Sequence, residues 1–237
     1  MSSPHAPAAA VHQPAVTSMR HPLAQTLLLL TFTTGLIDAV SYLGIGHVFT
    51  ANMTGNIVFL GFGIAGGSGL PVVAPLISLA AFLVGAGGGG MLASRMAGRR
   101  PQHVARALSV EALLVGAAAV VAAAADVHAN ELSGYVVIAL LALSMGARNA
   151  TVRRLAVPDL TTTVLTMTLT GLAADSRLFG GSGEGSTRRV AAVLAMLVGA
   201  LTGALLQKTS LFLPLALAAS LACFAGVAYP RADRASR

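Results

Sequence analysis

The stretch DAVSYLGIGHVFTANMTGN, residues 38–56, sets an aspartate, a histidine and two asparagines in a strongly apolar chain. Hydrophobic residues make up 55% of the 237 residues, charged residues make up only 10%, and the mean hydropathy is +0.79. A soluble domain carries roughly 25% charged residues. This chain has too few charges to cover a water-facing surface, so lipid must be the solvent for most of it.

The positive charge and the single cysteine exclude several classes of protein. The net charge is +7, but the basic residues are scattered between apolar runs and aromatic residues are only 5%, which is unlike a nucleic-acid-binding surface. Cys223 stands alone, so neither an intrachain disulfide nor a cysteine-based metal site is predicted. We expect a lipid bilayer as the partner, and we expect no nucleic acid, no metal and no cofactor.

Residues 1–22 are rich in Ala and Pro, which predicts a disordered tail. Eight apolar runs follow this tail. A helix needs about 20 residues to cross a bilayer, and six runs are long enough. Two others, 48–65 and 160–174, are the shortest and most polar. The six long runs are 24–46, 71–94, 107–125, 132–150, 189–207 and 210–229.

Arginine and lysine decide how many of these runs cross. If all eight cross, the 15 basic residues divide seven against eight, and neither orientation satisfies the positive-inside rule. If the two short runs return to the side they entered, fourteen basic residues lie on one side and only Lys208 on the other. The distribution therefore predicts an all-α polytopic membrane protein with six transmembrane helices, two re-entrant or broken helical segments, and both termini in the cytoplasm.

The chain also resembles itself. AFLVGAGGGGML (81–92) and AMLVGALTGALL (195–206) share seven of twelve residues, and each carries a GxxxG pair that would let helix backbones approach closely. Upstream, GLIDA (35–39) aligns with GARNA (146–150). The glycines predicted to pack helices are Gly85, Gly89, Gly199 and Gly203.

The similarity continues in the short runs, where TANMTGN (50–56) aligns with TTVLTMT (162–168). Each half then holds one span, one re-entrant segment and two further spans. Three crossings per half make the second half inverted, an arrangement typical of transporters. The predicted units are a first repeat at 23–126, an inverted repeat at 131–230 and a basic cytoplasmic tail at 231–237.

Polar side chains in the two short segments are the candidate pathway residues, because polar groups at membrane depth are tolerated where they line a watery cavity or are buried in protein. Thr50 and Thr54 lie four residues apart, as do Asn52 and Asn56. The alternative is that these hydroxyls and amides bond to their own helices. The second segment carries the stripe Thr162, Thr166 and Thr170.

Asp38 is the acid deepest in a predicted span, and its repeat counterpart is the neutral Asn149. A carboxyl group there suits proton coupling or a cation site. The alternative is structural, a pair with Arg148 or with the backbone amides of a broken helix. Glu111 is expected to snorkel or to pair with an arginine, and His47 to be an interfacial histidine.

The motifs GLIDAVSYLGIGHVFTANMTGNIVFLG and DLTTTVLTMTLTGLA resemble the YoaK-like family of bacterial inner-membrane proteins, a domain of unknown function. The resemblance covers about residues 22–230 and is most specific at 38–56. It implies a polytopic bacterial plasma-membrane protein without an established activity, and it supplies no substrate and no catalytic residues.

Three classes of function stay open from the sequence. The leading prediction is a secondary transporter or channel for a small solute, with a proton as a candidate coupling ion. The second is a scaffold or sensor that does not transport and assembles with other membrane proteins. A membrane enzyme is the third, but the chain lacks a Gly-x-Ser-x-Gly motif and histidines at metal-ligand spacing, so catalytic residues are not expected. A homo-oligomer is compatible with each class.

Overall fold

A computed structural model describes residues 19, 21–67, 69–155 and 165–235. Every regular element in these residues is helical. Six helices are long and apolar enough to cross a membrane, which confirms the predicted number of spans. They are α1 (Pro22–Val40, extended by a π-helix over Ser41–Gly46), α3 (Val73–Arg95), α4 (Arg100–Ala124), α5 (Leu132–Leu155), α7 (Ser186–Leu206) and α8 (Phe212–Ala235).

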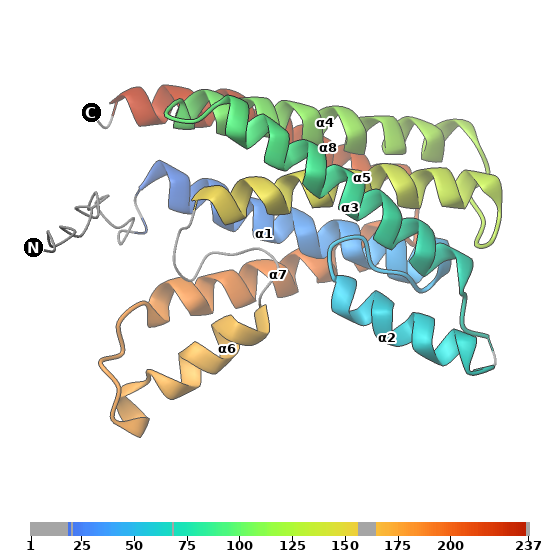
Figure 1. Cartoon of the computed structure of the whole chain (residues 1–237), viewed down its shortest axis with the longest axis horizontal. Helices are drawn as coiled ribbons and strands as arrows, with labels where there is room; N and C mark the ends of the chain where they lie inside the picture. The colour runs from blue at the N-terminus through green and yellow to red at the C-terminus, as the bar shows by residue number, and fades with distance from the viewer. Residues whose placement is uncertain (1–18, 20, 68, 156–164, 236–237) are drawn as a thin grey trace, which may run out of the picture.

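The two remaining α-helices are shorter, α2 (Met53–Ile64) and α6 (Leu165–Ala174). Figure 1 shows that each begins near the middle of the bundle and that they run to opposite ends. α2 runs to the end at which α1 finishes, and α6 runs to the end at which α1 begins. A helix of 12 or 10 residues spans only about half of the hydrocarbon core at 1.5 Å per residue.

Long helices pack in pairs drawn from different parts of the chain. α1 lies along α7, α3 lies along α5, and α4 lies along α8 (Figure 1). The α1–α7 contact is tight because a Cβ atom on Gly199 would overlap the carbonyl oxygen of Phe32, and one on Gly203 would lie 2.6 Å from that of Leu36. Only glycine allows this approach, which places the two backbones in direct contact.

The α3–α5 contact has the same construction. A Cβ atom on Gly85 would overlap the carbonyl oxygen of Leu143, and one on Gly89 would lie 2.7 Å from that of Ala147. Gly87 behaves differently, since nothing lies within 4 Å of the position its Cβ would take. Close packing therefore belongs to one face of α3.

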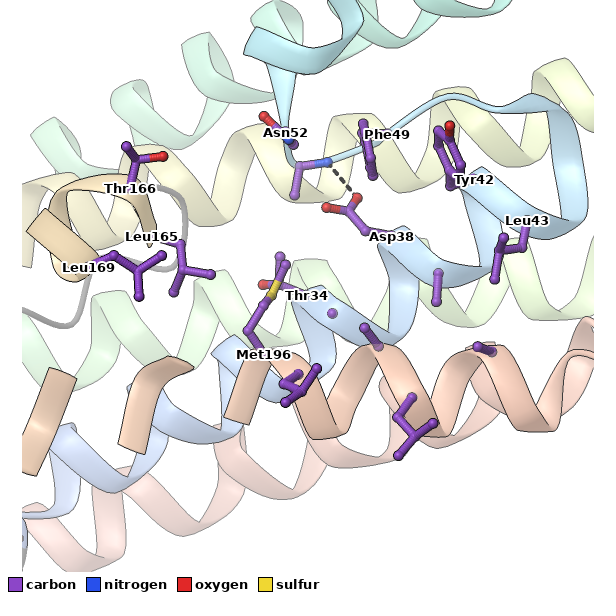
Figure 2. Close-up of a pocket in the computed structure, with 17 residues that line it drawn as sticks. Thr34, Asp38, Tyr42, Leu43, Phe49, Asn52, Leu165, Thr166, Leu169 and Met196 are labelled. Atoms are coloured by element: carbon purple, nitrogen blue, oxygen red, sulfur yellow. Dashed lines mark hydrogen bonds between the residues drawn. The ribbon is translucent and has the colours of Figure 1, made fainter. Parts of the chain in front are cut away.

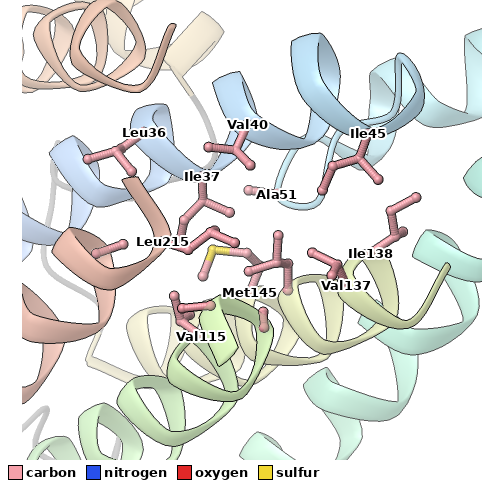
Figure 3. Packing of buried hydrophobic residues seen from close by; sticks show 14 of the residues in the cluster. Leu36, Ile37, Val40, Ile45, Ala51, Val115, Val137, Ile138, Met145 and Leu215 are labelled. Atoms are coloured by element: carbon pink, nitrogen blue, oxygen red, sulfur yellow. The ribbon is translucent and has the colours of Figure 1, made fainter. Parts of the chain in front are cut away.

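Apolar side chains fill the centre of the bundle (Figure 3). The main cluster joins α1, α4, α5 and α8, and Figure 3 shows Ile37, Val115, Met145 and Leu215 meeting there. Ala51, which lies in the loop before α2, belongs to the same cluster. The loop is therefore anchored in the core of the bundle.

Basic residues gather at one end of the bundle, where α3 and α5 end and α4 and α7 begin. Arg95 closes α3, and Arg153 and Arg154 lie in the last turn of α5. Lys208 lies at the opposite end, after α7. Arg148, one of the fourteen basic residues expected on the cytoplasmic side, is buried within α5.

Candidate functional site

The site begins where α1 stops being a regular helix. The α-helix widens into a π-helix over Ser41–Gly46, which begins three residues after Asp38. Such local widening of a helix is frequent at functional sites. His47 then takes a left-handed conformation with φ 54°, and the chain turns back towards the middle of the bundle, where α2 starts at Met53.

The Asp38 carboxylate holds this returning loop. Its Oδ1 accepts hydrogen bonds from the backbone N–H groups of Thr50 and Ala51, each at 3.0 Å, and from the Thr50 hydroxyl at 3.3 Å. Asp38 is only 5% exposed and Thr50 is fully buried. Of the two structural partners expected for Asp38, the structure shows the backbone amides and not Arg148.

The hydrogen bonds that Asp38 accepts among the described residues all go to Oδ1, so its second carboxylate oxygen has no hydrogen-bond partner there, and Asp38 lines a cavity. Figure 2 shows it turned towards Leu165 and Thr166 at the start of α6. One oxygen of Asp38 is therefore structural, and the other is available to the space between the two short helices.

That space is a cavity of about 640 Å³. Asp38 is the only charged side chain among the described residues that line it. Asn52, Thr166, Tyr42 and Thr34 add polar groups, and hydrocarbon makes up most of the wall (Figure 2). The apolar lining residues include Leu43, Leu165, Leu169, Met196, Leu197 and Leu201.

The first short segment contributes Asn52 to the cavity but turns Asn56 away from it. Asn52 caps α2, because its side chain accepts from the Gly55 N–H at 3.3 Å. Asn56 is fully buried and pairs with the backbone of Phe49, accepting from its N–H at 2.9 Å and donating to its carbonyl at 2.6 Å. Thr54 is exposed and does not line the cavity.

Ser78 of α3 completes the Asn56 network. Its hydroxyl lies 3.1 Å from the Asn56 amide nitrogen and donates to the Phe49 carbonyl at 2.7 Å. Neither Phe49 nor Ser78 was among the predicted site residues. A serine inside an apolar span was the available signal, but the contact depends on a loop geometry that residue spacing does not reveal.

The second short segment contributes Thr166 to the cavity. The Thr170 hydroxyl donates to the Thr166 carbonyl at 2.9 Å, so this threonine bonds to its own helix. Thr162 lies outside the described residues. Asn149 is half-buried on α5 and is absent from the described cavity lining.

A second buried polar cluster joins α1, α4 and α5. Arg148 forms an ion pair with Glu111, and its Nε donates to Glu111 Oε2 at 2.8 Å. The guanidinium also donates to the Thr34 hydroxyl at 2.7 Å, the Thr33 hydroxyl at 2.9 Å and the Leu30 carbonyl at 2.8 Å. The expectation that Glu111 pairs with an arginine is confirmed, and its partner comes from another helix.

The Arg148 cluster reaches the cavity through one residue. Thr34 lines the cavity, and its hydroxyl both accepts from Arg148 and donates to the Leu30 carbonyl at 2.9 Å. All five guanidinium N–H groups have acceptors, which is what a charge buried in protein requires. The cluster therefore supports the cavity wall without presenting a free positive charge to it.

Aromatic rings brace the loop. Tyr42 stacks on Phe49 with ring centroids 4.8 Å apart, and Phe49 stacks on Phe59 at 6.0 Å. His47 meets Tyr42 edge-on at 5.3 Å. These contacts fix the π-helix, the loop and α2 as one unit. No group of three His, Cys, Asp or Glu residues in the described part of the chain is placed to hold a metal ion.

Comparison with known proteins gives the evolutionary context of this site. A family model described as "Protein of unknown function (DUF1275)" matches residues 26–228. The UPF0700 transmembrane protein YoaK of Bacillus subtilis (strain 168) is 36% identical over 160 residues, which cover 65% of this chain and 68% of that protein. No solved structure matches the chain.

Proposed function

We propose a function for this chain, which belongs to the DUF1275 family of proteins of unknown function. From the cavity beside Asp38, we infer that this multi-pass membrane protein is a secondary transporter or channel for a small solute. The observation that carries the proposal is an Asp38 oxygen without a partner among the described residues, in a cavity of about 640 Å³ that the N-cap of α2 and the start of α6 help to line. Cavities that bind small molecules are typically 300–1,000 Å³, with few polar groups on an apolar wall.

We further propose that the two halves form an inverted repeat, an arrangement typical of transporters. The Gly85–Leu143 and Gly199–Phe32 contacts are equivalent under the sequence alignment, since the glycines are 114 residues apart and their partners 111. Gly35 and Gly146 extend the match. A Cβ atom on Gly35 would lie 2.8 Å from the Ala200 nitrogen, and one on Gly146 would lie 2.8 Å from the Ala86 nitrogen. In the proposed repeat, the helix pairs α1–α7 and α3–α5 would exchange under one operation.

The placement of the short helices also supports a pathway. Both begin near the middle of the bundle, and residues at the starts of both line the cavity (Figures 1 and 2). Broken helices whose ends meet at a midplane site are the usual construction of inverted-repeat transporters. A solute at Asp38 would then lie between two halves of the pathway. The half beside α2 would open to one side of the membrane, and the half beside α6 would open to the other.

We assign the end with Arg95, Arg153 and Arg154 to the cytoplasm, together with both termini. The positive-inside rule favours this orientation. Its consequence is that α2 re-enters from outside and α6 from the cytoplasm of a bacterial plasma membrane.

A flux screen tests the proposal. The purified full chain in liposomes is expected to move at least one small solute faster than protein-free liposomes, with and without a pH gradient. Met196→Trp is the test variant, because it fills the cavity. Val198→Trp, on the same helix but outside the cavity lining, is its matched control. Absence of flux for every solute would favour the scaffold or sensor reading instead.

A further inference from the structure

The charge of Asp38 is the starting point for identifying the solute. Arg148–Glu111 and Arg189–Asp175 are ion pairs of the structure, and Asp38 takes part in neither. Its Oδ1 receives three hydrogen bonds, but its Oδ2 has no partner in the described part of the chain. A buried carboxylate without a compensating cation is costly within a membrane. The cavity is therefore built for a ligand that carries positive charge or donates a hydrogen bond to this oxygen.

An anionic ligand is disfavoured by the same geometry. No lysine, arginine or histidine is among the described residues that line the cavity, and Asp38 would repel a negative group. At the start of α2, the Asn52 side-chain oxygen already accepts from the Gly55 N–H, and the Asn52 backbone carbonyl accepts from the Asn56 N–H. Thr50 and Ala51 give their N–H groups to Asp38, so these donors are also occupied.

A bare metal ion fits the cavity poorly. Hard cations such as Mg²⁺ and Ca²⁺ take six or more oxygen ligands. Here the Thr34 hydroxyl is held by Arg148 and the Leu30 carbonyl, and the Asn52 carbonyl group accepts from Gly55. Thr166 and Tyr42 leave too few oxygens to replace a hydration shell. A volume of about 640 Å³ is also far larger than one dehydrated ion requires.

The wall opposite Asp38 is hydrocarbon. Leu165 and Leu169 project from α6, and Met196 lies beside them on α7 (Figure 2). Methionine adapts to ligands of different shape because its side chain is flexible and polarisable. On the other side, the stacked rings of Tyr42 and Phe49 border the cavity. Aromatic faces attract organic cations.

From these features we infer that the cavity binds a small organic cation, an alkyl- or arylalkyl-ammonium, which donates an N–H to Asp38 Oδ2 and lays its hydrocarbon against α6 and α7. This inference rests on the proposed pathway and names the class of its solute. Thr166 Oγ1 is a second acceptor at the α6 side.

The test is thermal unfolding of the purified full chain with 2-phenylethylammonium or with 2-phenylethanol, which has nearly the same shape but no charge. We expect the ammonium to raise the unfolding temperature in a saturable manner, and the alcohol and NaCl to leave it unchanged. Asp38→Asn keeps an oxygen for the Thr50 and Ala51 amides but removes the charge. It is expected to weaken ammonium binding by about tenfold or more.

A second pair of variants covers the case in which Asp38→Asn folds poorly. Leu197 lines the cavity on α7, whereas Leu194 is on the same helix outside the described lining. Leu197→Phe is expected to change the apparent affinity for the ammonium, and Leu194→Phe to leave it unchanged. Equal stabilisation by the alcohol or by Na⁺, or equal effects of both leucine variants, would overturn the inference.

Liposome measurements separate this inference from the proposed function. Ammonium binding that depends on Asp38 without any ammonium flux would leave the cation site standing and remove the transport proposal. Flux of a neutral or anionic solute without ammonium binding would do the reverse.

Discussion

Arg148 and Glu111 form an ion pair between α5 and α4 in which only 2% and 3% of the two side chains are exposed. Sequence alignment places Ile37 opposite Arg148, because both follow the Gly-x pair of GLIDA and GARNA. One half of the molecule thus carries a charge where the other carries a hydrocarbon side chain. The pair is complete within the protein, and this distinguishes it from Asp38.

Breaking this pair is expected to destabilise the fold. Arg148→Met would leave the Glu111 carboxylate buried without its cation, at a cost of about 3–5 kcal/mol. The double variant Arg148→Met with Glu111→Leu should recover much of that loss. Thr33 and Thr34 need no replacement, since both hydroxyls also donate to the Leu30 carbonyl. Thermal unfolding in detergent measures both variants.

Asp175→Asn supplies the control for this series. The Arg189–Asp175 pair has an N–O distance of 2.8 Å, but the Asp175 side chain is 51% exposed. Its loss should cost less than about 1 kcal/mol. If Arg148→Met proves no more harmful than Asp175→Asn, the buried pair does not stabilise the bundle.

The close helix contacts give a second prediction. Gly85→Ala and Gly199→Ala should each destabilise the protein by about 1–3 kcal/mol or more, because the added methyl group would overlap a carbonyl oxygen of the facing helix. Gly88→Ala lies on α3 as well, but nothing lies within 4 Å of its Cβ position, and it should be neutral. Folded yield and unfolding temperature are the measurements. A uniform response of the three variants would mean that these faces do not determine the packing.

Asn56 gives a third prediction. Asn56→Ala would leave the N–H group of Phe49 without an acceptor, at a cost of about 1–3 kcal/mol, while the Phe49 carbonyl would keep its hydrogen bond from Ser78. Thr54→Ala, on the exposed side of the same helix, should change stability by less than about 0.5 kcal/mol. Limited proteolysis should then cut near residues 47–52 in the Asn56 variant and not in the Thr54 variant. Equal resistance of the two variants would show that the amide pair is dispensable.

Much of the architecture could be predicted because it depends on chain-wide quantities. The lengths of the apolar runs define the six spans, and the shortness of 48–65 and 160–174 singles out α2 and α6. The contacts of individual side chains were harder. Asp38 meets the amides of Thr50 and Ala51 only because the π-helix and loop reverse the chain, a geometry that periodicity does not encode.

Other site residues were placed differently from what their composition suggested. Asn56 was a pathway candidate, yet its side chain faces Phe49 and Ser78. Arg148 lies in the predicted run 132–150, but its partner Glu111 lies 37 residues earlier on another helix. A lone acid and a lone base in adjacent apolar runs were the signal that could have paired them.

Orientation in the membrane gives a fourth prediction. Reporter fusions after Arg100, Arg154 and Arg189 should report the cytoplasm, because the basic end of the bundle is expected to stay inside. Fusions near Ala129 and Lys208 should report the outside. An external signal at both Arg154 and Arg189 would contradict the assignment of α6 as a segment that enters from the cytoplasm.

The final prediction concerns Asp38 and coupling. Asp38→Asn should accumulate as folded protein at close to the level of the unchanged chain, because the amide oxygen can still accept from the Thr50 and Ala51 N–H groups. Asp38→Leu cannot, and it would leave two buried N–H groups without acceptors, at a cost of about 2–4 kcal/mol. The comparison separates the structural oxygen of this carboxylate from the one that faces the cavity.

If a proton couples to transport at this site, flux driven by a pH gradient should disappear in Asp38→Asn, because the only titratable carboxyl group lining the described cavity is gone. Flux down the solute's own gradient can continue, since the cavity keeps its shape. Counterflow and gradient-driven uptake in the same liposomes measure the two properties separately. Full gradient-driven uptake by a well-folded Asp38→Asn variant would show that the proton binds elsewhere, and poor folding of Asp38→Asn would show that the negative charge itself holds the loop.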